Sequence, residues 1–420
     1  MIAALCLPLI VLALFALRQN LLVVLGIVTG YAYAVWGGGV LTNIVVDAWD
    51  AVNKDILLSI PLYILAGNVM SRGAMAGRLI RVMRAVSAPV PGGLAIAAVM
   101  SCALFAAVSG SGTVTLLAVG GVIYPALLAA GYSKSFSIGA LCAAGTLGII
   151  IPPSIPLILY GIMTQTSIAD LFIAGLGPAA VLLTLMTGYA VISNLHMPAT
   201  GWSGAELRAA LRAGIWALLM PVLILGGIYS GYFTATESAA VAVVYAIGVE
   251  TLVYRELGFS DLYDIIGQTT RLLGSLFPVL MLALSLNVFL AYQQVPELLV
   301  ATLGDLVTSR TGFLIGMNVF LLGIGCIMDI GSAILILAPV LQPLAAAQGI
   351  DPVHFGIIVV VNLEIGYLTP PLGLNLIVAM TVFREGFWMI CRAVLPFVGL
   401  MLFGLLIVAF VPELSLFLVR

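Results

Sequence analysis

A double proline interrupts a long apolar segment at two places, Pro152-Pro153 and Pro370-Pro371. Proline removes a backbone donor and clashes with the preceding helical turn, so a helix is expected to unwind at each place. Unwound backbone at membrane depth is tolerated only where it is buried in protein or lines a cavity, and its free carbonyl groups can then bind a cation. The two elbows, residues 148–156 and 366–375, are therefore predicted cation sites.

A short polar tip precedes each elbow, at residues 109–113 (Ser-Gly-Ser-Gly-Thr) and 328–332 (Met-Asp-Ile-Gly-Ser). An offset of 218 residues brings the first tip and elbow onto the second, with Gly148 on Gly366. We interpret the chain as an internal duplication whose halves each contain two breaks.

The composition requires a bilayer around most of the chain. Of 420 residues 63% are hydrophobic and only 8% are charged, so several stretches of about 20 apolar residues must lie in lipid. The run 2–17 is interpreted as a spanning helix rather than a signal peptide, because no basic residue precedes it and no small-residue cleavage site follows. The cysteines show no metal-ligand spacing and are interpreted as free packing residues: Cys6, Cys102, Cys142, Cys326 and Cys391.

The expected fold is an all-α polytopic membrane protein with inverted-topology repeats. Each arm beside a polar tip is too short to span the membrane comfortably, so each tip is expected to end a re-entrant hairpin. The expected division is N-terminal scaffold helices 1–55; a first inverted repeat 56–166 with hairpin 92–131 and broken helix 135–166; scaffold helices and an amphipathic arm 167–272; a second inverted repeat 273–384 with hairpin 312–347 and broken helix 353–383; and a C-terminal helix 385–420.

Polar residues predict the connections between these elements. A polar turn is expected at residues 47–55, an inner loop at Arg208 and Arg212 before a helix at 215–229, and an amphipathic stretch ending at Arg271 before the next helix. Most of the 15 basic residues then lie on one side, which the positive-inside rule identifies as the cytoplasmic side. On this topology the first hairpin enters from the cytoplasm and the second from outside.

Several motifs together resemble a known family. They are Pro61-Leu62-Tyr63-Ile64-Leu65-Ala66-Gly67-Asn68, the tip Ser109 to Thr113, Ile151-Pro152-Pro153-Ser154-Ile155, Phe233-Thr234-Ala235-Thr236-Glu237-Ser238, and Asp351-Pro352-Val353-His354-Phe355-Gly356 leading to Thr369-Pro370-Pro371-Leu372-Gly373. In this order they resemble the large membrane subunit of the tripartite ATP-independent periplasmic (TRAP) transporters, DctM-like members of the ion transporter superfamily. The resemblance covers nearly the whole chain.

The resemblance implies a Na⁺-driven importer in the bacterial inner membrane. It implies two partners, a separate small four-helix membrane subunit and a periplasmic binding protein that delivers an organic anion. Hairpins and broken helices would form a transport domain that moves like an elevator against the scaffold. No organic cofactor and no nucleic-acid partner are expected; the coupling ions would be two or more Na⁺.

Two pseudo-equivalent Na⁺ sites are expected, each formed by a tip and its elbow. Their residues are Ser109, Gly110, Ser111, Thr113, Gly148 and Pro152 in the first site, and Asp329, Gly331, Ser332, Gly366, Thr369 and Pro370 in the second. The organic anion is expected between the tips, at Thr113, Asn287, Ser332 and Asn375. A single hydroxyl in a membrane helix more often bonds its own backbone than a ligand, and that alternative stays open for each Ser and Thr.

Three acidic residues have two interpretations each. Asp329 is either a Na⁺ ligand or a cap on the following helix, and the cap is favoured because its counterpart is neutral Ser111. Glu364, whose counterpart is Thr146, is either protonated or turned toward a cavity. Glu237 either functions in transport or caps the helix that begins near it.

Enzyme and channel alternatives have weaker support. An aspartyl protease pair would need Asp264 and Asp305 within spans, and both fall in expected connections. A serine protease would need a histidine beside Ser109, and only His196 and His354 are present. A passive channel does not require mirrored broken helices. The substrate class stays open among C4-dicarboxylates, sialic acid, other sugar acids, oxo acids, sulfonates and ectoine-like compounds.

Overall fold

The computed structural model describes residue 10, residues 13–14, residue 17 and residues 19–199, 201–303, 309–370 and 373–420. These residues form helices joined by turns, with no β-strand among them. Within this described part, seven helices are long and apolar enough to cross a membrane. The protein is therefore all-α and multi-pass, as expected. Most of the expected first helix, 2–17, and Cys6 lie outside the described residues.

The N-terminal region differs from expectation at one connection. Helix α2 (Leu21–Trp36) begins at an Asn20 cap, whose side chain accepts from the Val23 amide at 3.0 Å. The expected polar turn at 47–55 is wrong, because α3 (Thr42–Val52) occupies most of it. An aspartate within this helix, Asp47, accepts a hydrogen bond from the Tyr33 hydroxyl at 2.5 Å. The hydrogen bond from Tyr33 of α2 thus explains how Asp47, a charged residue that suggested a loop, lies within a helix.

The segment expected to form the first repeat opens with two helices that meet at a sharp bend. A 3₁₀ turn (Asp55–Leu58) leads into α4 (Ser59–Arg72), and α5 (Met75–Ser87) follows at 69°. Hairpin 1 comes next and consists of α6 (Gly93–Ser109), α7 (Gly112–Thr115), a π-helical turn (Leu116–Gly120) and α8 (Gly121–Ala129). The first broken helix follows and consists of α9 (Lys134–Thr146), a 3₁₀ turn (Leu147–Ile149) and α10 (Ile155–Thr164). The helix is interrupted where Pro152-Pro153 predicts.

Three long helices separate the repeats: α11 (Ile168–Ser193), α12 (Gly204–Tyr229) and α13 (Ala235–Gly248, continued by a π-helical turn at Val249–Val253). The expected inner loop at Arg208 and Arg212 is wrong, because both lie within α12. Its true start is a Ser203 cap that accepts from the Glu206 amide at 3.2 Å. For α13 the cap interpretation of Glu237 is confirmed: Thr234 is the N-cap, and Glu237 reciprocates in a capping box.

The second repeat begins with the longest described helix, α14 (Phe259–Tyr292). The expected separate amphipathic stretch ending at Arg271 is wrong, since it continues into the spanning helix without a break. A short helix, α15 (Val295–Leu303), leads to hairpin 2, whose arms are α16 (Arg310–Gly325) and α17 (Ile330–Ala347). The second broken helix consists of α18 (Pro352–Tyr367) and α19 (Leu374–Phe383). The last helices are α20 (Phe387–Phe410) and α21 (Glu413–Leu416).

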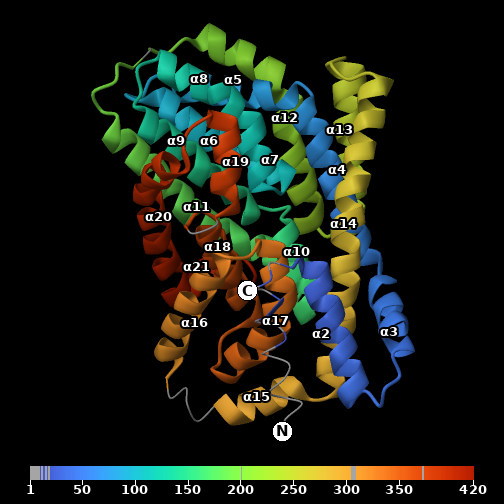
Figure 1. Ribbon diagram of the computed structural model, residues 1–420. Helices are drawn as coiled ribbons and strands as arrows, with labels where there is room; N and C mark the ends of the chain where they lie inside the picture. Colours follow the sequence, from blue (N-terminus) through green and yellow to red (C-terminus); the bar gives the residue numbers. More distant parts are fainter. Residues whose placement is uncertain are drawn as a thin grey trace.

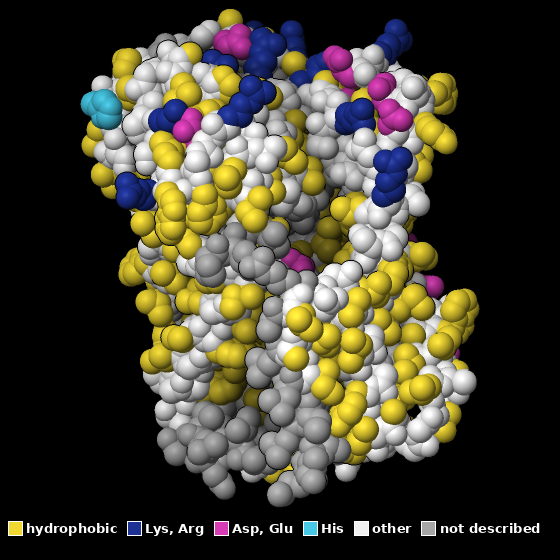
Figure 2. Space-filling model, viewed as in Figure 1, with side chains coloured by type: hydrophobic (Ala, Val, Ile, Leu, Met, Phe, Trp, Pro, Cys, Tyr) yellow, Lys and Arg dark blue, Asp and Glu magenta, His cyan; other side chains and the backbone are white. Residues whose placement is uncertain are grey.

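The two hairpins lie at opposite ends of the molecule (Figure 1). Hairpin 1, with α6 and α8, lies at the top of the view beside α5, and hairpin 2, with α16 and α17, lies toward the bottom. The Lys and Arg side chains gather at the hairpin 1 end, above a band of hydrophobic side chains (Figure 2). The positive-inside rule predicts that this basic end faces the cytoplasm.

The first halves of the broken helices, α9 and α18, form the centre of the fold. Every residue of α18 from His354 to Gly366 is buried, and so is every residue of α9 from Ser137 to Thr146. Both segments are apolar on nearly all sides, which is typical of helices surrounded by other helices. The elbows that follow them are therefore held inside the protein rather than against lipid.

Candidate functional site

The tip of hairpin 1 is a compact turn of hydroxyl groups. Helix α6 ends at Ser109, Gly110 takes a left-handed φ of 60°, and Ser111 is the N-cap of α7. The Ser109 and Thr115 hydroxyl oxygens lie 2.9 Å apart, and the Thr115 hydroxyl donates to the Ser111 carbonyl at 3.0 Å. The tip thus brings several oxygen atoms together without an ionised group.

This tip rests on the first elbow. A Cβ on Gly110 would lie 3.0 Å from the Pro153 carbonyl oxygen, and a Cβ on Gly148 would lie 2.1 Å from the Ala106 Cβ. After the break, the Ser154 hydroxyl donates to the Ile149 carbonyl and accepts from the Leu157 amide at 3.3 Å. Glycine is required on both sides of this contact because the backbones approach so closely.

Hairpin 2 has a tip of the same design with a different cap. Asp329 is the N-cap of α17: its Oδ2 accepts from the Ser332 amide at 2.9 Å, and its Oδ1 accepts from the Ser332 hydroxyl. The capping interpretation is thus confirmed. Ser111, its counterpart at the 218-residue offset, caps α7 by accepting from the Val114 amide at 3.5 Å.

The second elbow contacts hairpin 2 as the first contacts hairpin 1. A Cβ on Gly366 would lie 2.6 Å from the Gly325 Cα. Thr369 folds back, its amide donating to the Gly366 carbonyl and its hydroxyl to the Ile365 carbonyl, each at 2.8 Å. Gly331 lies in the first turn of α17 and Pro370 within the elbow, while Pro371 lies outside the described residues. Gly366 thus contacts the arm of hairpin 2 just before its tip, while Asp329 and Ser332 bond to one another within the tip.

Tyr367 connects the two tips and was missed from sequence. Its phenol lies against the Thr113 side chain of hairpin 1 and within electrostatic reach of Asp329 in hairpin 2. A tyrosine at the end of an apolar helix carries no sequence signal that it faces two polar loops. Tyr367 thus lies close to Thr113 of the first tip, while the Ser332 hydroxyl of the second tip bonds to Asp329.

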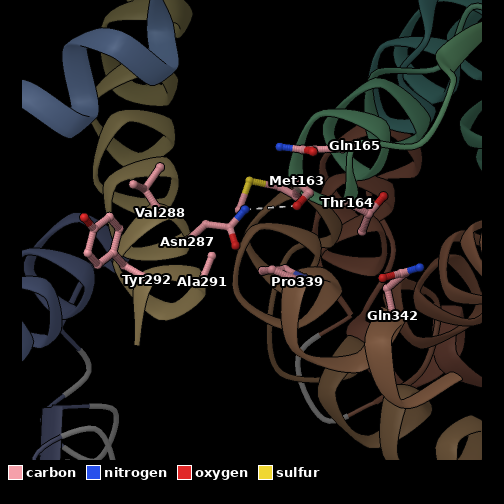
Figure 3. Close-up of a pocket in the computed structure, with 9 residues that line it drawn as sticks. All are labelled: Met163, Thr164, Gln165, Asn287, Val288, Ala291, Tyr292, Pro339 and Gln342. Atoms are coloured by element: carbon pink, nitrogen blue, oxygen red, sulfur yellow. Dashed lines mark hydrogen bonds between the residues drawn. The ribbon is translucent and has the colours of Figure 1, made fainter. Parts of the chain in front are cut away.

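The two asparagines expected beside the substrate each bond to the backbone of the first broken helix. Asn375 is buried in α19 and its amide donates to the Cys142 carbonyl at 3.4 Å. Asn287 is on α14, where its amide donates to the Met163 carbonyl at 3.0 Å across to α10 (Figure 3). The structure therefore does not bring the four expected substrate residues into one cluster.

Asn287 instead lines a pocket of about 540 Å³ between α14, α10 and α17 (Figure 3). The lining carries several uncharged polar side chains on these helices: Thr164, Gln165, Asn287 and Gln342. The Asn287 amide caps one of the last carbonyl groups of α10, so it joins the long helix α14 to the outer half of a broken helix.

The residues considered for an enzyme do not form one. The Ser109 hydroxyl bonds within its own tip, while the Nδ1 of His354 lies 3.3 Å from the Ser415 hydroxyl. Asp264 is exposed and lies 4.0 Å from Arg72, and Asp305 is outside the described residues. The described part of the chain holds no group of three or more His, Cys, Asp or Glu side chains that could bind a metal ion.

The donor set of each tip and elbow fits a small hard cation. Hydroxyl and backbone carbonyl oxygens are the ligands such cations prefer, and broken helices in transporters supply them at the membrane midplane. The residues that could hold Na⁺ are those of the two expected sites, with Asp329 contributing through the cap on α17. A transition-metal site would require nitrogen or sulfur ligands, which these tips and elbows do not supply.

Comparison with known proteins places this architecture in a class. The chain is similar to the Alcanivorax borkumensis YdaH transporter, with a TM-score of 0.66 at 16% identity, covering 88% of this chain and 87% of that one. The two proteins thus share a fold.

The family follows from closer relatives. The family model of the tripartite ATP-independent periplasmic transporter, DctM component, matches residues 8–414. The C4-dicarboxylate TRAP transporter large permease protein DctM of Pseudomonas aeruginosa is 40% identical over 379 residues, covering 89% of this chain and 88% of that protein. The ectoine TRAP transporter large permease protein TeaC of Halomonas elongata is 34% identical, covering 93% and 92%. This chain belongs to the DctM family of TRAP transporter large permeases and is a transporter component rather than an enzyme.

Proposed function

We propose that this chain is the large permease of a Na⁺-coupled importer of a small organic anion in the bacterial inner membrane. The observation that carries the proposal is the contact between a hairpin and an unwound elbow in each half of the chain. Gly110 of the first tip lies against Pro153, and Gly325, just before the second tip, lies against Gly366. Each contact places hydroxyl and carbonyl oxygens around a point inside the protein. Such points can replace part of the water shell of a small cation.

Two Na⁺ ions would drive uptake with useful free energy. One charge crossing 100 mV releases roughly 2.3 kcal/mol, and a tenfold concentration gradient adds about 1.4 kcal/mol. Two ions together supply roughly 7 kcal/mol by the same arithmetic. A dicarboxylate dianion moves two charges against the same potential, so about 2.8 kcal/mol remains for its accumulation, which corresponds to roughly 100-fold.

We further propose that the chain consists of two inverted repeats and that a transport domain, with hairpins and broken helices from both repeats, moves like an elevator against a scaffold. Hairpins 1 and 2 and the broken helices α9–α10 and α18–α19 form the moving body, and α4, α12, α13 and α14 belong to the scaffold. The opposite placement of the hairpins supports this division (Figure 1). On this view the hydrogen bond from Asn287 to Met163 joins scaffold to moving body and must break during each cycle.

The substrate would bind between the tips, where Thr113 and Tyr367 would provide hydroxyl groups, while the Ser332 hydroxyl donates to Asp329 and would have to turn to reach a ligand. Helix N-termini at both tips favour a carboxylate there. We propose a C4-dicarboxylate as the first substrate class to test, since a relative named for that class shares 40% identity. Relatives named for isethionate, ectoine and 2,3-diketo-L-gulonate define the other classes to test.

The tripartite family implies that a small membrane subunit and a periplasmic binding protein complete the system. The test reconstitutes all three in sealed vesicles and measures uptake of a labelled C4-dicarboxylate, then of the other classes. We expect accumulation above the outside concentration that collapses when the Na⁺ gradient is removed. Downhill leakage that is indifferent to Na⁺ would instead identify a passive channel.

A further inference from the structure

A pocket of about 490 Å³ lies where α4 bends into α5, and the proposed transport mechanism does not use it. Its walls come from this bend, from α5, from α12 and from the segment that follows α13. The described lining includes three basic side chains, one acidic side chain and two glycines: Arg72, Arg78, Arg81, Glu256, Gly73 and Gly77. The charged side chains of the lining thus favour an anion.

Uncharged groups hold Arg78 in this pocket. Its guanidinium carbon lies 3.7 Å from the centroid of the Tyr254 ring, and its Nη1 donates to the Ala213 carbonyl at 3.4 Å. The Tyr254 hydroxyl donates to the same carbonyl at 3.0 Å, so the ring and the guanidinium share one anchor on α12. The guanidinium is therefore fixed in position while N–H donors remain available for a ligand.

Arg78 has no carboxylate partner of its own. Among the described residues, no carboxylate oxygen lies within 4.0 Å of its guanidinium. The buried Glu250 carboxylate accepts instead from the Ala74 and Met75 amides, each at 2.9 Å. The first amides of α5 are therefore already used, and the pocket depends on the arginine side chains for its donors.

The other two arginines are paired only at the surface. Arg81 lies 2.9 Å from the Glu206 carboxylate and Arg72 lies 4.0 Å from that of Asp264, and all four side chains are well exposed. Exposed ion pairs contribute little free energy. Both arginines can therefore turn toward an anion in the pocket.

Gly77 keeps part of the pocket open. A Cβ at this position would meet nothing within 4 Å, although the residue lies in the first turn of α5 beside Arg78. The volume of the pocket lies in the range of small-molecule sites and is ample for a phosphate group. Arginine recognises phosphate well because its planar fork donates two parallel hydrogen bonds.

The surroundings of the pocket favour a lipid over a soluble anion. Helix α4 runs beside α13 and α14, and α5 turns away from it by 69° at the end of the molecule where Lys and Arg side chains gather (Figure 1 and Figure 2). Leu252 and Val253, which directly precede Tyr254, are 73% and 45% exposed. Apolar side chains beside a basic pocket suit a ligand that has both a charged head group and acyl chains.

We propose that this pocket binds the phosphate of an anionic phospholipid from the membrane leaflet at the basic end. Arg78 would donate to the phosphate, with Arg72 and Arg81 adding positive charge, and the acyl chains would lie along Leu252 and Val253. The bound lipid would join α5, α12 and the end of α13. This inference rests on the membrane location of the chain and is independent of Na⁺ coupling.

The test measures thermal unfolding of the purified permease complex in an uncharged detergent as dioleoyl phosphatidylglycerol is added at constant ionic strength. A ligand that binds only the folded state raises stability with its concentration. We expect phosphatidylglycerol to raise the unfolding temperature. Dioleoylglycerol, which lacks the phosphate, should not raise it, and glycerol phosphate, which lacks the acyl chains, should act only at far higher concentration. An equal effect of glycerol phosphate at the same concentration would make the ligand a soluble anion and overturn the lipid assignment.

Arg78→Gln removes the fixed guanidinium and is expected to raise the phosphatidylglycerol concentration that gives half of the stabilisation by about tenfold or more, since a hydrogen bond to a charged group is lost. Gly77→Leu keeps every arginine but fills the open space, and it should weaken the response as much. Leucine suits a helix better than glycine does, so this variant should fold.

The matched controls make the same changes away from the pocket. Arg392→Gln removes an exposed arginine from α20, and Gly267→Leu adds a side chain to α14 where a Cβ would meet nothing within 4 Å. Both controls should keep the phosphatidylglycerol dependence of the unchanged protein. If Arg78→Gln and Gly77→Leu keep it as well, the site is overturned.

Native mass spectrometry of the same complexes counts the bound phospholipid directly, whatever the stability of each variant. The unchanged complex is expected to retain phosphatidylglycerol that Arg78→Gln and Gly77→Leu lose. If Gly77→Leu instead releases the small membrane subunit and keeps the lipid, the pocket is a contact between subunits and the lipid assignment is wrong.

Discussion

Gly366 of the second broken helix lies against Gly325 of hairpin 2, so closely that a Cβ on Gly366 would come within 2.6 Å of the Gly325 Cα. The first repeat has the same relationship between Gly148 and Ala106, where the added Cβ would lie 2.1 Å from a methyl carbon. In both repeats the last helical turn before the elbow supports a hairpin arm just before its tip. The position of each tip is therefore fixed by backbone contact rather than by long side chains.

Gly366→Ala is expected to lower uptake at least tenfold by separating hairpin 2 from its elbow. The added methyl meets backbone atoms, which cannot rotate away, and overpacking of this kind costs about 1–3 kcal/mol. Vesicle uptake and thermal unfolding measure the two effects. Gly323→Ala is the control in the same hairpin arm, because its Cβ would meet nothing within 4 Å; it should be neutral or slightly stabilising. Equal effects of the two substitutions would contradict the role assigned to the contact between Gly366 and Gly325.

Thr113→Val and Ser332→Ala are expected to raise the Na⁺ concentration required for half-maximal uptake by about tenfold each. Each substitution removes a hydroxyl at one tip, where it would serve as a ligand or orient the carbonyls that do. Titration of uptake with Na⁺ at fixed total salt provides the measurement. Thr184→Val, which removes an exposed hydroxyl bonded within α11 at 2.7 Å, is the control. Unchanged Na⁺ dependence in both tip variants would contradict the assignment of these sites.

Asp329 is expected to act mainly as a cap. Asp329→Asn keeps an acceptor for the Ser332 amide, so its free energy of unfolding should stay within about 0.5 kcal/mol of that of the unchanged protein. Asp329→Ala should lower the free energy of unfolding by about 1 kcal/mol. Uptake by Asp329→Asn should retain its Na⁺ dependence, since neutral Ser111 holds the equivalent position in hairpin 1. A large loss of Na⁺ affinity in Asp329→Asn, with stability intact, would instead make the carboxylate a direct ligand.

Glu250 is expected to hold the bend between α4 and α5. Its carboxylate is buried at the end of α13 and accepts from the Ala74 and Met75 amides, each at 2.9 Å. Glu250→Ala leaves two amides without partners and should destabilise the protein by about 2–4 kcal/mol. Glu250→Gln keeps one acceptor oxygen and should lose less. Thermal unfolding of both variants decides the point, and equal stability of Glu250→Ala and the unchanged protein would refute it.

The sequence contained enough to predict the elbows and the tips. Consecutive prolines cannot be accommodated in a helix interior, and a Ser or Asp before a helix start is a cap whatever surrounds it. The start of α12 could also have been predicted from the sequence, because Ser203 and Glu206 form a local capping pattern. It was missed because Arg208 and Arg212 suggested a loop, although basic residues are common in helices that extend beyond the membrane.

Other features depend on contacts between distant residues and have no local signal. Tyr367 lies beside Thr113 only because the two repeats meet at the centre of the fold. Glu250 caps a helix that lies 175 residues earlier in the chain. The single helix through Arg271 also escaped prediction, since a charged first half and an apolar second half resemble two elements.

Simultaneous measurement of labelled Na⁺ and labelled substrate entering vesicles that contain the complete transporter tests the central claim most directly. Na⁺ is expected to enter in a fixed ratio with each substrate molecule, and Gly366→Ala is expected to reduce both fluxes together. Substrate that accumulates without accompanying Na⁺ would contradict the account.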